Sequence, residues 1–214
     1  MKRCYLVRHA QTLWNGENRI QGHTNSPLSP LGFEQARQLA GWFARRRIDG
    51  IFSSWLLRSR ETALAIATDN GHRVAPVIER DLAEINLGAW EGLTPLDVES
   101  RYPGAYEIWR TRPSRVAIPD AEPLTAFQER VRGVFGRLAA GMREGGEYVV
   151  VTHGGVIAAF LAEVLEADFD TVLRRMRLDN AGITAVDFNA APPALLYVND
   201  TGHLASDPAV LPLC

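Results

Sequence analysis

Two apolar runs in the sequence end in the same way, with a histidine directly after the predicted strand. The first run ends in Arg8 and His9, and a later one ends in Thr152, His153 and Gly154. In a parallel α/β sheet, the carboxyl ends of neighbouring strands meet at one edge, beside helix N-termini whose free N–H groups attract anions. We therefore expect the two imidazoles to face each other in one crevice.

Two arginines belong to the same predicted crevice. Arg8 precedes the first histidine, and Arg58 lies one short turn into the helix that follows a strand predicted at residues 50–53. Together with the imidazoles, they form a concentrated positive pocket in a chain whose formal net charge is −2. Guanidinium groups stay charged and grip phosphate oxygens bidentately, so the pocket suits a phosphoryl group better than a carboxylate.

The residue types in this pocket can carry out phosphoryl transfer. A neutral imidazole nitrogen can attack phosphorus and hold the phosphoryl group covalently, and His9 is the candidate nucleophile. Arg8 and His153 would stabilise negative charge on the phosphoryl oxygens in the transition state. Glu84 is the candidate general acid, because a bound phosphate dianion favours a protonated carboxyl group beside it. This chemistry requires neither a metal nor a cofactor.

The composition is that of a globular chain with one substantial core. The 214 residues are 46% hydrophobic, which predicts a single domain over residues 1–214. The net charge offers no attraction to nucleic acid or to an anionic membrane, so we expect neither as a partner. Cys4 and Cys214 are a poor basis for a disulfide framework. We find neither a signal segment nor an apolar run of roughly 20 residues, and we expect a cytoplasmic protein.

Short apolar runs alternate with longer helical patterns along the chain. This alternation predicts an α/β fold in three layers, with a mostly parallel central sheet flanked by helices. Two late strands surround the stretch from Ala190 to Pro193 and predict a hairpin, so the sheet is expected to be mixed. The predicted strands are residues 3–8, 50–53, 74–78, 147–152, 182–188 and 195–199.

Four longer helices are predicted from apolar periodicity. The first has Ser29 as its N-cap and Pro30 as its first residue, and it should end near Arg47. The second follows Ser54, and the fourth begins at Gly154. The side chains expected to face the core are Ala36, Leu39, Ala40 and Phe43, then Leu57, Leu64 and Ala65, then Phe127, Val131, Val134, Phe135, Leu138 and Met142, and finally Ile157, Phe160, Leu161 and Val164.

The segment from about residue 82 to residue 124 has a weaker pattern that is rich in Gly, Pro, Trp and Tyr. It predicts short helices and loops that cover the active-site end of the sheet, where loops commonly determine specificity. Trp14, Trp90, Tyr106 and Trp109 are expected to line an apolar entrance suited to aryl or nucleoside-like phosphates. The alternative for each of the four is a position in the core.

Five stretches of the sequence together resemble the histidine phosphatase superfamily, the phosphoglycerate-mutase-like proteins. They are LVRHAQTLWN, NRIQGHTNSPLSPLGFEQA, SSWLLRSRETA, EINLGAWEG and VVVTHGG, and they follow one another in the expected order. The resemblance extends from Leu6 to about Phe188. It implies an enzyme that works through a phosphohistidine.

The resemblance also implies a role for each matching residue. Arg8 and His9 match the Arg-His motif of the family, with His9 as the phosphohistidine. Arg58 matches the second phosphate-binding arginine, Glu84 the proton donor, and His153 the second histidine of the pocket. Further phosphate-binding candidates are Asn15, Gln21 and Gly22, which match positions lining the phosphate site, and Gly154 at the predicted helix N-terminus.

Within the superfamily, the sequence favours a phosphatase over a mutase. The interval from Glu84 to His153 has no room for the additional insertion of the cofactor-dependent glycolytic mutases, and an open pocket admits water. EINLGAWEG resembles the broad-specificity and α-ribazole-phosphate phosphatases. We therefore expect metal-independent hydrolysis of small-molecule phosphate esters. The alternatives are a phosphoglycerate mutase and a non-catalytic phospho-ligand-binding module.

Each candidate residue also has a purely structural interpretation. The two histidines are then satisfied core residues, the arginines and Glu84 are salt-bridge partners, and Asn15 is a turn or cap residue. Asn25 departs from the Asp of many relatives, outside the chemical core of the motif. Arg45 to Arg47 predict a solvated helix end. His23, His72 and His203 are expected on the surface or in loops, and a homodimer is left open.

Overall fold

A six-stranded sheet in the order β3-β2-β4-β1-β5-β6 forms the centre of the molecule, in a computed structural model that describes residues 2–69 and 74–204. β1 to β4 run parallel to one another, and β5 runs antiparallel to both of its neighbours, which confirms the predicted mixed sheet. The third strand is shorter than predicted and begins at Pro76, where the missing N–H costs no ladder hydrogen bond. The strands are β1 (Arg3–Arg8), β2 (Gly50–Ser53), β3 (Pro76–Ile78), β4 (Glu147–Thr152), β5 (Ile183–Asp187) and β6 (Ala194–Asp200).

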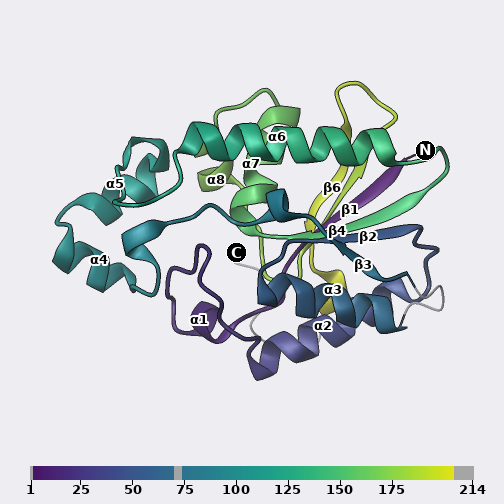
Figure 1. The fold of residues 1–214 in the computed structure, drawn as a ribbon, viewed down its shortest axis with the longest axis horizontal. Helices are drawn as coiled ribbons and strands as arrows, with labels where there is room; N and C mark the ends of the chain where they lie inside the picture. The colour runs from purple at the N-terminus through teal and green to yellow at the C-terminus, as the bar shows by residue number, and fades with distance from the viewer. Residues whose placement is uncertain (1, 70–73, 205–214) are drawn as a thin grey trace.

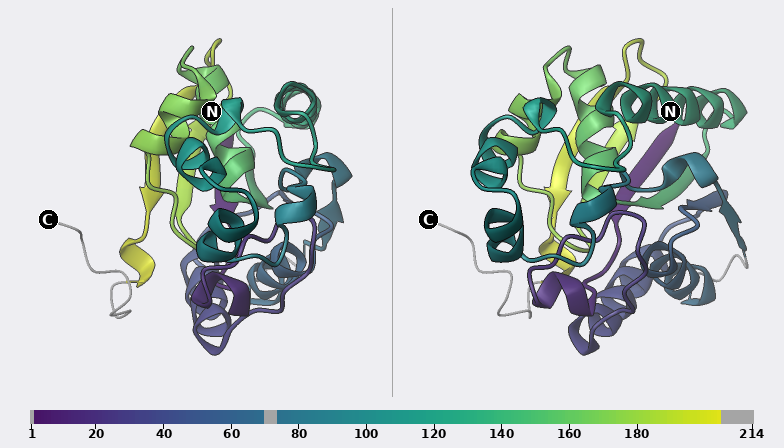
Figure 2. Two further views of the ribbon diagram at one scale, coloured as in Figure 1. Left: turned by 90° about the vertical axis from the view of Figure 1, so that its left-hand side faces the viewer. Right: turned by 60° about the vertical axis from the view of Figure 1, so that its left-hand side comes forward.

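Helices cover both faces of the sheet, as Figures 1 and 2 show. On one face lie α2 (Pro30–Phe43) and α3 (Leu57–Asp69), and on the other lie α6 (Leu124–Gly141), α7 (Gly154–Val164) and α8 (Phe169–Arg175). The predicted three-layer α/β fold is therefore confirmed. The remaining helical segments are short: α1 (Leu13–Gly16), η1 (Arg80–Leu82), η2 (Gly88–Trp90), α4 (Pro95–Arg101), α5 (Ala105–Thr111), η3 (Pro113–Arg115) and η4 (Gly202–Leu204).

The two central strands are buried on both faces. In β1, Cys4 and Leu6 pack on the side of α6 and α7, whereas Tyr5 and Val7 pack on the side of α2 and α3. β4 alternates in the same way, with Val150 on the first side and its neighbours on the other. A strand covered on both faces reads as a continuous apolar run, which is why these two strands stand out in the sequence.

Most predicted helical faces are confirmed, with one clear exception. The expected core positions of α2, and those from Phe127 to Met142, are buried. In α3, by contrast, Leu64 is 52% exposed and the prediction that it faces the core is wrong. Polar residues, Arg58 and Thr62 among them, take up part of the buried face of this helix beside Ala63. Apolar periodicity misplaces the face because Arg58 lines the site cavity and Thr62 accepts from the backbone N–H of Ala10, beside His9.

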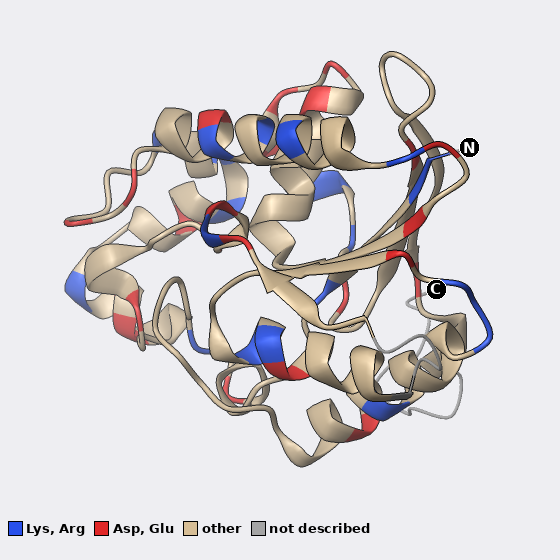
Figure 3. Cartoon of the chain, turned by 45° about the vertical axis from the view of Figure 1, so that its right-hand side comes forward, with Lys and Arg blue, Asp and Glu red and all other residues tan. Residues whose placement is uncertain are grey.

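Charged residues lie on the helices and loops and at the ends of strands, while the middle of the sheet carries none (Figure 3). The first long helix ends at Phe43, earlier than predicted, and Arg46 then lies with its guanidinium carbon 3.7 Å from the centre of the Trp42 ring. Cys4 is a buried free thiol. Cys214 and His72 lie outside the described residues. Within residues 2–69 and 74–204, no helix has the length and apolar character needed to span a membrane.

Candidate active site

The register of the two central strands brings the predicted histidines together. Arg8 in β1 pairs with Thr152 in β4, so the next residue of each strand leaves the sheet beside the other. The backbone N–H of His9 donates to the carbonyl oxygen of Thr152 at 2.9 Å. The centres of the His9 and His153 rings lie 5.2 Å apart. In the structure, as the sequence predicts, the two imidazoles therefore lie beside each other at one edge of the sheet.

Both imidazoles are buried and neutral. His9 is 3% exposed and His153 is fully buried. Burial is the main cause that lowers the pKa of both rings well below 6.5, and the positive charge of Arg58 adds to it. A positive charge on either ring would have to be held away from water and beside guanidinium groups, which is unfavourable. Both rings therefore keep an unprotonated nitrogen at neutral pH.

A single hydrogen bond determines which nitrogen of His9 is free. Nδ1 of His9 lies 2.8 Å from the carbonyl oxygen of Ala10. A carbonyl oxygen can only accept, so Nδ1 carries the hydrogen atom. In the neutral ring, Nε2 then holds the lone pair. This tautomer is the one that a nitrogen nucleophile acting through Nε2 requires.

Backbone carbonyls hold one side of each arginine and leave the other side available. Nη1 and Nη2 of Arg58 donate to the carbonyl oxygens of Thr24 at 3.1 Å and Gly22 at 2.8 Å. Nη1 of Arg8 donates to the carbonyl oxygen of Leu178. Burial lowers the pKa of Arg58 to about 10, so its guanidinium is still charged at neutral pH.

Arg8, His9, Arg58 and His153 surround one buried cup. Several nitrogens in this cup have no hydrogen-bond partner within the described part of the chain. They are Nε of Arg8, Nε of Arg58 and both ring nitrogens of His153. Leaving buried polar groups unpaired is costly, and such groups commonly mark a ligand site. Arg8, His9 and Arg58 line a cavity of about 420 Å³ together with Asn15, Gln21, Gly22, Glu84 and Gly154. Apart from the fully buried His153, which lies against the His9 ring, every predicted site residue therefore borders one cavity.

The amide of Asn15 combines a structural role with a free donor. Its Oδ1 accepts from the backbone N–H of Thr12 at 3.0 Å and from Nδ2 of Asn180 at 3.3 Å. Asn15 is thus part of the capping box that begins α1, as its structural interpretation predicted. Because its oxygen is already used, the amide nitrogen is the group left to donate to a ligand in the cavity.

Glu91 holds the loop that carries Gly22 to Thr24. Its carboxylate accepts from the backbone N–H groups of His23 at 2.8 Å, Thr24 at 2.9 Å and Leu87 at 3.1 Å. Gly22 has a φ of +52°, and a Cβ atom there would lie 2.0 Å from Oε1 of Glu91. Only glycine satisfies both conditions, so this contact positions the carbonyl that binds Arg58.

The carboxyl group of Glu84 lies against the N-terminus of α7. Oε1 accepts from the backbone N–H of Ile85 at 3.0 Å, and Oε2 accepts from that of Gly155 at 3.1 Å. A Cβ atom at Gly155 would lie 2.3 Å from Oε1, so the close approach requires glycine. Glu84 is held by backbone groups and has no ion-pair partner in the described residues, which does not support its interpretation as a salt-bridge residue.

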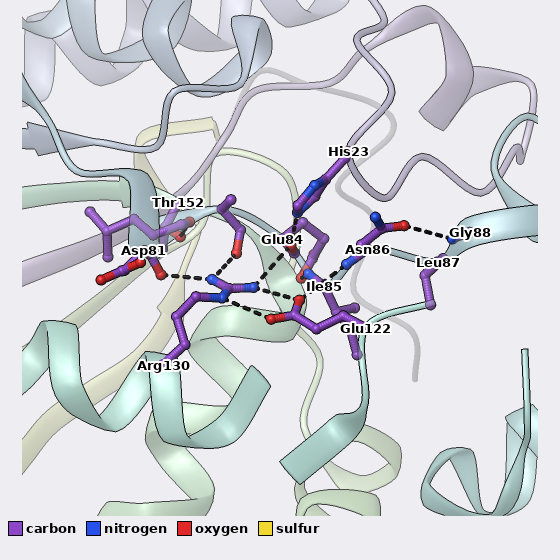
Figure 4. A network of polar contacts seen from close by, with 12 residues as sticks. His23, Asp81, Glu84, Ile85, Asn86, Leu87, Gly88, Glu122, Arg130 and Thr152 are labelled. Carbon is purple, nitrogen blue, oxygen red and sulfur yellow. Dashed lines mark hydrogen bonds and ion pairs between the residues drawn. The ribbon is translucent and has the colours of Figure 1, made fainter. Parts of the chain in front are cut away.

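Arg130 of α6 clamps the backbone from Asp81 to Glu84 (Figure 4). It donates to the carbonyl oxygens of Asp81 at 2.7 Å, Ala83 at 2.8 Å and Glu84 at 3.4 Å. It also forms a two-pronged ion pair with Glu122, with N···O distances of 2.9 and 2.7 Å. His23 adds a bond from Nε2 to the Glu84 carbonyl at 2.8 Å. The position of the Glu84 carboxyl thus depends on a helix that contributes nothing to the cavity wall.

The sequence predicts no role for Glu91, Arg130 or Asn180. Glu91 had a usable signal, since it is the second acid of the EINLGAWEG stretch that contains Glu84. Arg130 had none, because its role depends on where α6 packs. Asn25, the departure from the family pattern, accepts from the backbone N–H of Leu57 at 2.9 Å through Oδ1, which an Asp oxygen would do equally well.

The expectation of an aromatic entrance is correct for one residue of four. Trp109 lines the cavity. Trp90 is 1% exposed and packs with Leu93, and Tyr106 packs against the same cluster. The ring of Trp14 approaches Gly92 away from the cavity. A core position buries nearly the whole ring of Trp90, which is favourable and explains why this ring is not at the entrance.

Comparisons of the sequence and of the structure with known proteins find phosphatases and a phosphoglycerate mutase as relatives. Residues 4–201 match the family described as Histidine phosphatase superfamily (branch 1). A protein of Hydrogenobacter thermophilus, provisionally named phosphoserine phosphatase 2, is 32% identical over 203 residues, which cover 95% of this chain and 98% of the relative. A protein of Yersinia pestis named as a probable phosphoglycerate mutase is 33% identical over 95% of each chain. The structure of a mycobacterial glucosyl-3-phosphoglycerate phosphatase with VO3 has a TM-score of 0.83 at 30% identity and covers 94% of this chain and 100% of that chain.

The buried neutral histidines predict a loss of stability in acid. Their pKa values in the folded chain lie below 6.5. Below about pH 6.5 the unfolded chain therefore binds protons that the folded chain does not, and each ring lowers the free energy of unfolding by up to about 1.4 kcal/mol per pH unit. His153→Gln should make this slope shallower by one such contribution. Denaturant titrations at about pH 7.5, 6 and 5 measure it, and a slope equal to that of wild type would contradict the prediction.

The Arg130 clamp predicts a large difference between two arginines of the same helix. Arg130 and Glu122 are each 18% exposed, so Arg130→Met leaves the carboxylate without its cation and the carbonyls of Asp81 and Ala83 unpaired, and should cost about 2 to 4 kcal/mol of unfolding free energy. Arg132→Met is the matched control, because its pair with Glu163 is exposed to water and should contribute little. Urea unfolding of both variants measures the difference. Equal stability of the two would mean that the clamp is not structural.

Proposed function

The chain belongs to the histidine phosphatase superfamily, and from this membership we propose that it hydrolyses small-molecule phosphomonoesters through a phosphohistidine at His9. Relatives named as phosphatases support hydrolysis as the reaction. One observation carries the proposal: Nε2 of His9, the nitrogen with the lone pair, lies in a cup with His153 and two partly unpaired guanidinium groups. The cup supplies a neutral nucleophile and fixed positive charge in one place.

The first step transfers the phosphoryl group to the protein. The lone pair of Nε2 forms a bond to phosphorus while the bond from phosphorus to the ester oxygen breaks. Arg8, Arg58 and His153 bind the phosphoryl oxygens, where negative charge accumulates. Glu84, protonated when the phosphate dianion is bound, gives its proton to the departing oxygen. The leaving group departs as a neutral alcohol or phenol.

The second step returns the phosphoryl group to water. The Glu84 carboxylate accepts a proton from a water molecule, whose oxygen forms a bond to phosphorus as the bond to Nε2 breaks. Inorganic phosphate is released and Nε2 regains its lone pair. The backbone bonds that hold the Glu84 carboxyl at the N-terminus of α7 support this double use of one group. Over the two steps, one phosphate ester and one water molecule give one alcohol and one inorganic phosphate, and the protein returns to its starting state.

A phosphoglycerate mutase is the second candidate, because a protein with that name is 33% identical across nearly the whole chain. In a mutase, the alcohol that accepts the phosphoryl group is a second sugar-acid oxygen instead of water. A non-catalytic phospho-ligand module is the third candidate, and measurable turnover of any monoester would exclude it. A homodimer and a cytoplasmic location belong to the proposal as well, and light scattering after size exclusion tests the first of them.

His9 is tested by hydrolysis of p-nitrophenyl phosphate in the presence of EDTA. His9→Ala should lower kcat about a thousandfold or more, because it removes the group that forms the covalent intermediate. His203→Gln is the matched control, since this histidine lies beside Trp42 and borders no part of the cavity; its rate should equal that of wild type. EDTA should leave the wild-type rate unchanged. Equal rates for wild type and His9→Ala would remove His9 from the mechanism.

Glu84 is tested by the basicity of the leaving group. A p-nitrophenolate departs readily without a proton, whereas an alkoxide does not. Glu84→Gln should therefore lower kcat for an alkyl phosphate by about a hundredfold to ten-thousandfold, and for p-nitrophenyl phosphate far less. Steady-state kinetics on both esters give the two ratios. A loss of the same size on both esters would contradict a proton donor at this position.

Hydrolysis and mutase activity are separated by the products formed from 3-phosphoglycerate. Water has access to the cup in the open cavity, so we expect inorganic phosphate to be the main product. Phosphate release and formation of 2-phosphoglycerate can be followed in one sample by ³¹P NMR. An excess of 2-phosphoglycerate over phosphate would establish the mutase in place of the phosphatase.

A further inference from the structure

The cavity beside the histidines is lined by two chemically different sets of residues. The polar set contains the arginines, His9 and Glu84. The apolar set, which we call the wall, comes from four separate parts of the chain and belongs to one hydrophobic cluster. The wall residues are Ile20, Ile85, Leu87, Trp109, Phe169, Leu173, Met176 and Leu178. A cavity of about 420 Å³ is large enough for a small organic leaving group beside a phosphoryl group.

The wall is held in place by packing that is independent of the site chemistry. The Trp109 ring packs edge-on against the buried Trp90, with ring centres 5.9 Å apart. Phe169 at the start of α8 packs edge-on against Phe127 of α6. α5 and α8 contact each other at the same end of the sheet (Figure 1). The apolar surface is therefore preformed and does not need a ligand to assemble it.

Each cation that borders the cavity either faces the phosphoryl position or already has hydrogen-bond partners in the protein. Arg8 and Arg58 face the phosphoryl position. The remaining lining cation, Arg19, has its Nε 2.7 Å from Oε2 of Glu17, and its Nη1 donates to the carbonyl oxygen of Gly92 at 2.8 Å. An anionic group on the leaving-group side would thus lose water against the apolar wall, and to pair with Arg19, whose side chain is 37% exposed, it would have to compete with the Glu17 carboxylate. Burial of an unpaired charge is strongly unfavourable.

We propose that this phosphatase selects monoesters whose leaving group is apolar and uncharged, an aryl or arylalkyl alcohol, and discriminates against leaving groups that carry a carboxylate or a second phosphate. This inference rests on the proposed function and adds the substrate class. It differs from the activities that the names of three relatives describe, since phosphoserine and phosphoglycerates both carry a carboxylate. The discrimination comes from this wall, to which α5 contributes Trp109 and α8 contributes Phe169 and Leu173.

A pair of esters that differ only at the far end tests the selection. 3-Phenylpropyl phosphate and 3-(4-carboxyphenyl)propyl phosphate have leaving groups of the same basicity, so their chemical steps are matched. We expect kcat/KM for the carboxylate ester to be lower by about tenfold or more, with most of the change in KM, because the charge is buried against apolar groups in the complex. A ratio within twofold, or a preference for the carboxylate ester, would overturn the inference.

A single substitution should reverse part of the discrimination. Leu173→Arg places a cation on the wall, where it can pair with the carboxylate, and should raise the carboxylate-to-phenyl ratio of kcat/KM by about fivefold or more. Leu165→Arg is the matched control, since Leu165 is 43% exposed at the end of α7 and outside the cavity, and it should leave the ratio unchanged. An unchanged ratio in Leu173→Arg, with a circular dichroism spectrum and thermal unfolding like those of wild type, would contradict the assignment of the wall.

The two proposals fail in different ways. If wild type hydrolyses neither these esters nor p-nitrophenyl phosphate, the proposed phosphatase function is wrong. If it hydrolyses both esters at similar rates, the phosphatase function stands and the substrate class is wrong. If Leu173→Arg does not fold, which its circular dichroism and thermal unfolding would reveal, the wild-type pair of esters decides alone.

Discussion

The structure depends on one electrostatic constraint: two imidazoles and two guanidinium groups share a buried cup at the carboxyl ends of β1 and β4. Two fixed positive charges, together with exclusion from water, make a third charge on either ring unfavourable. The pKa values of both His9 and His153 are lowered for this reason, burial being the larger cause. The cup thus combines a strong attraction for a dianion with a histidine that remains neutral. A dianion is the ligand that relieves the unpaired donors.

Much of the surrounding structure serves to keep these four groups in place. Backbone carbonyls of the loop around Gly22 hold Arg58, and the Glu91 carboxylate holds that loop. Arg130 and Glu122 do the same for the segment that carries Glu84. The charged residues of this supporting layer are paired or hydrogen-bonded among themselves, so they do not compete for a ligand in the cavity. The glycines at 22 and 155 are required where carboxylates approach the backbone closely.

The strands and the cup could be predicted from the sequence because they depend on local patterns. A continuous apolar run ending in Arg8 and His9 identifies both a doubly covered strand and its functional end. The supporting residues depend on packing between distant segments, which periodicity does not report, as Arg130 illustrates. Leu64 was misplaced for a related reason: the buried face of α3 is partly polar, since Arg58 and Thr62 serve the site. The helix α8, whose Phe169 and Leu173 line the cavity, has seven residues, which are too few for a clear helical pattern.

The central claim is that both imidazoles of the cup are neutral and that His9 carries its hydrogen on Nδ1. The most direct test is ¹⁵N NMR of the histidine side chains in uniformly labelled protein at about pH 6, with His9→Asn used to assign the His9 signals. The account predicts one protonated nitrogen in each ring, with Nε2 of His9 unprotonated. Two protonated nitrogens in either ring, or a hydrogen on Nε2 of His9, would contradict it.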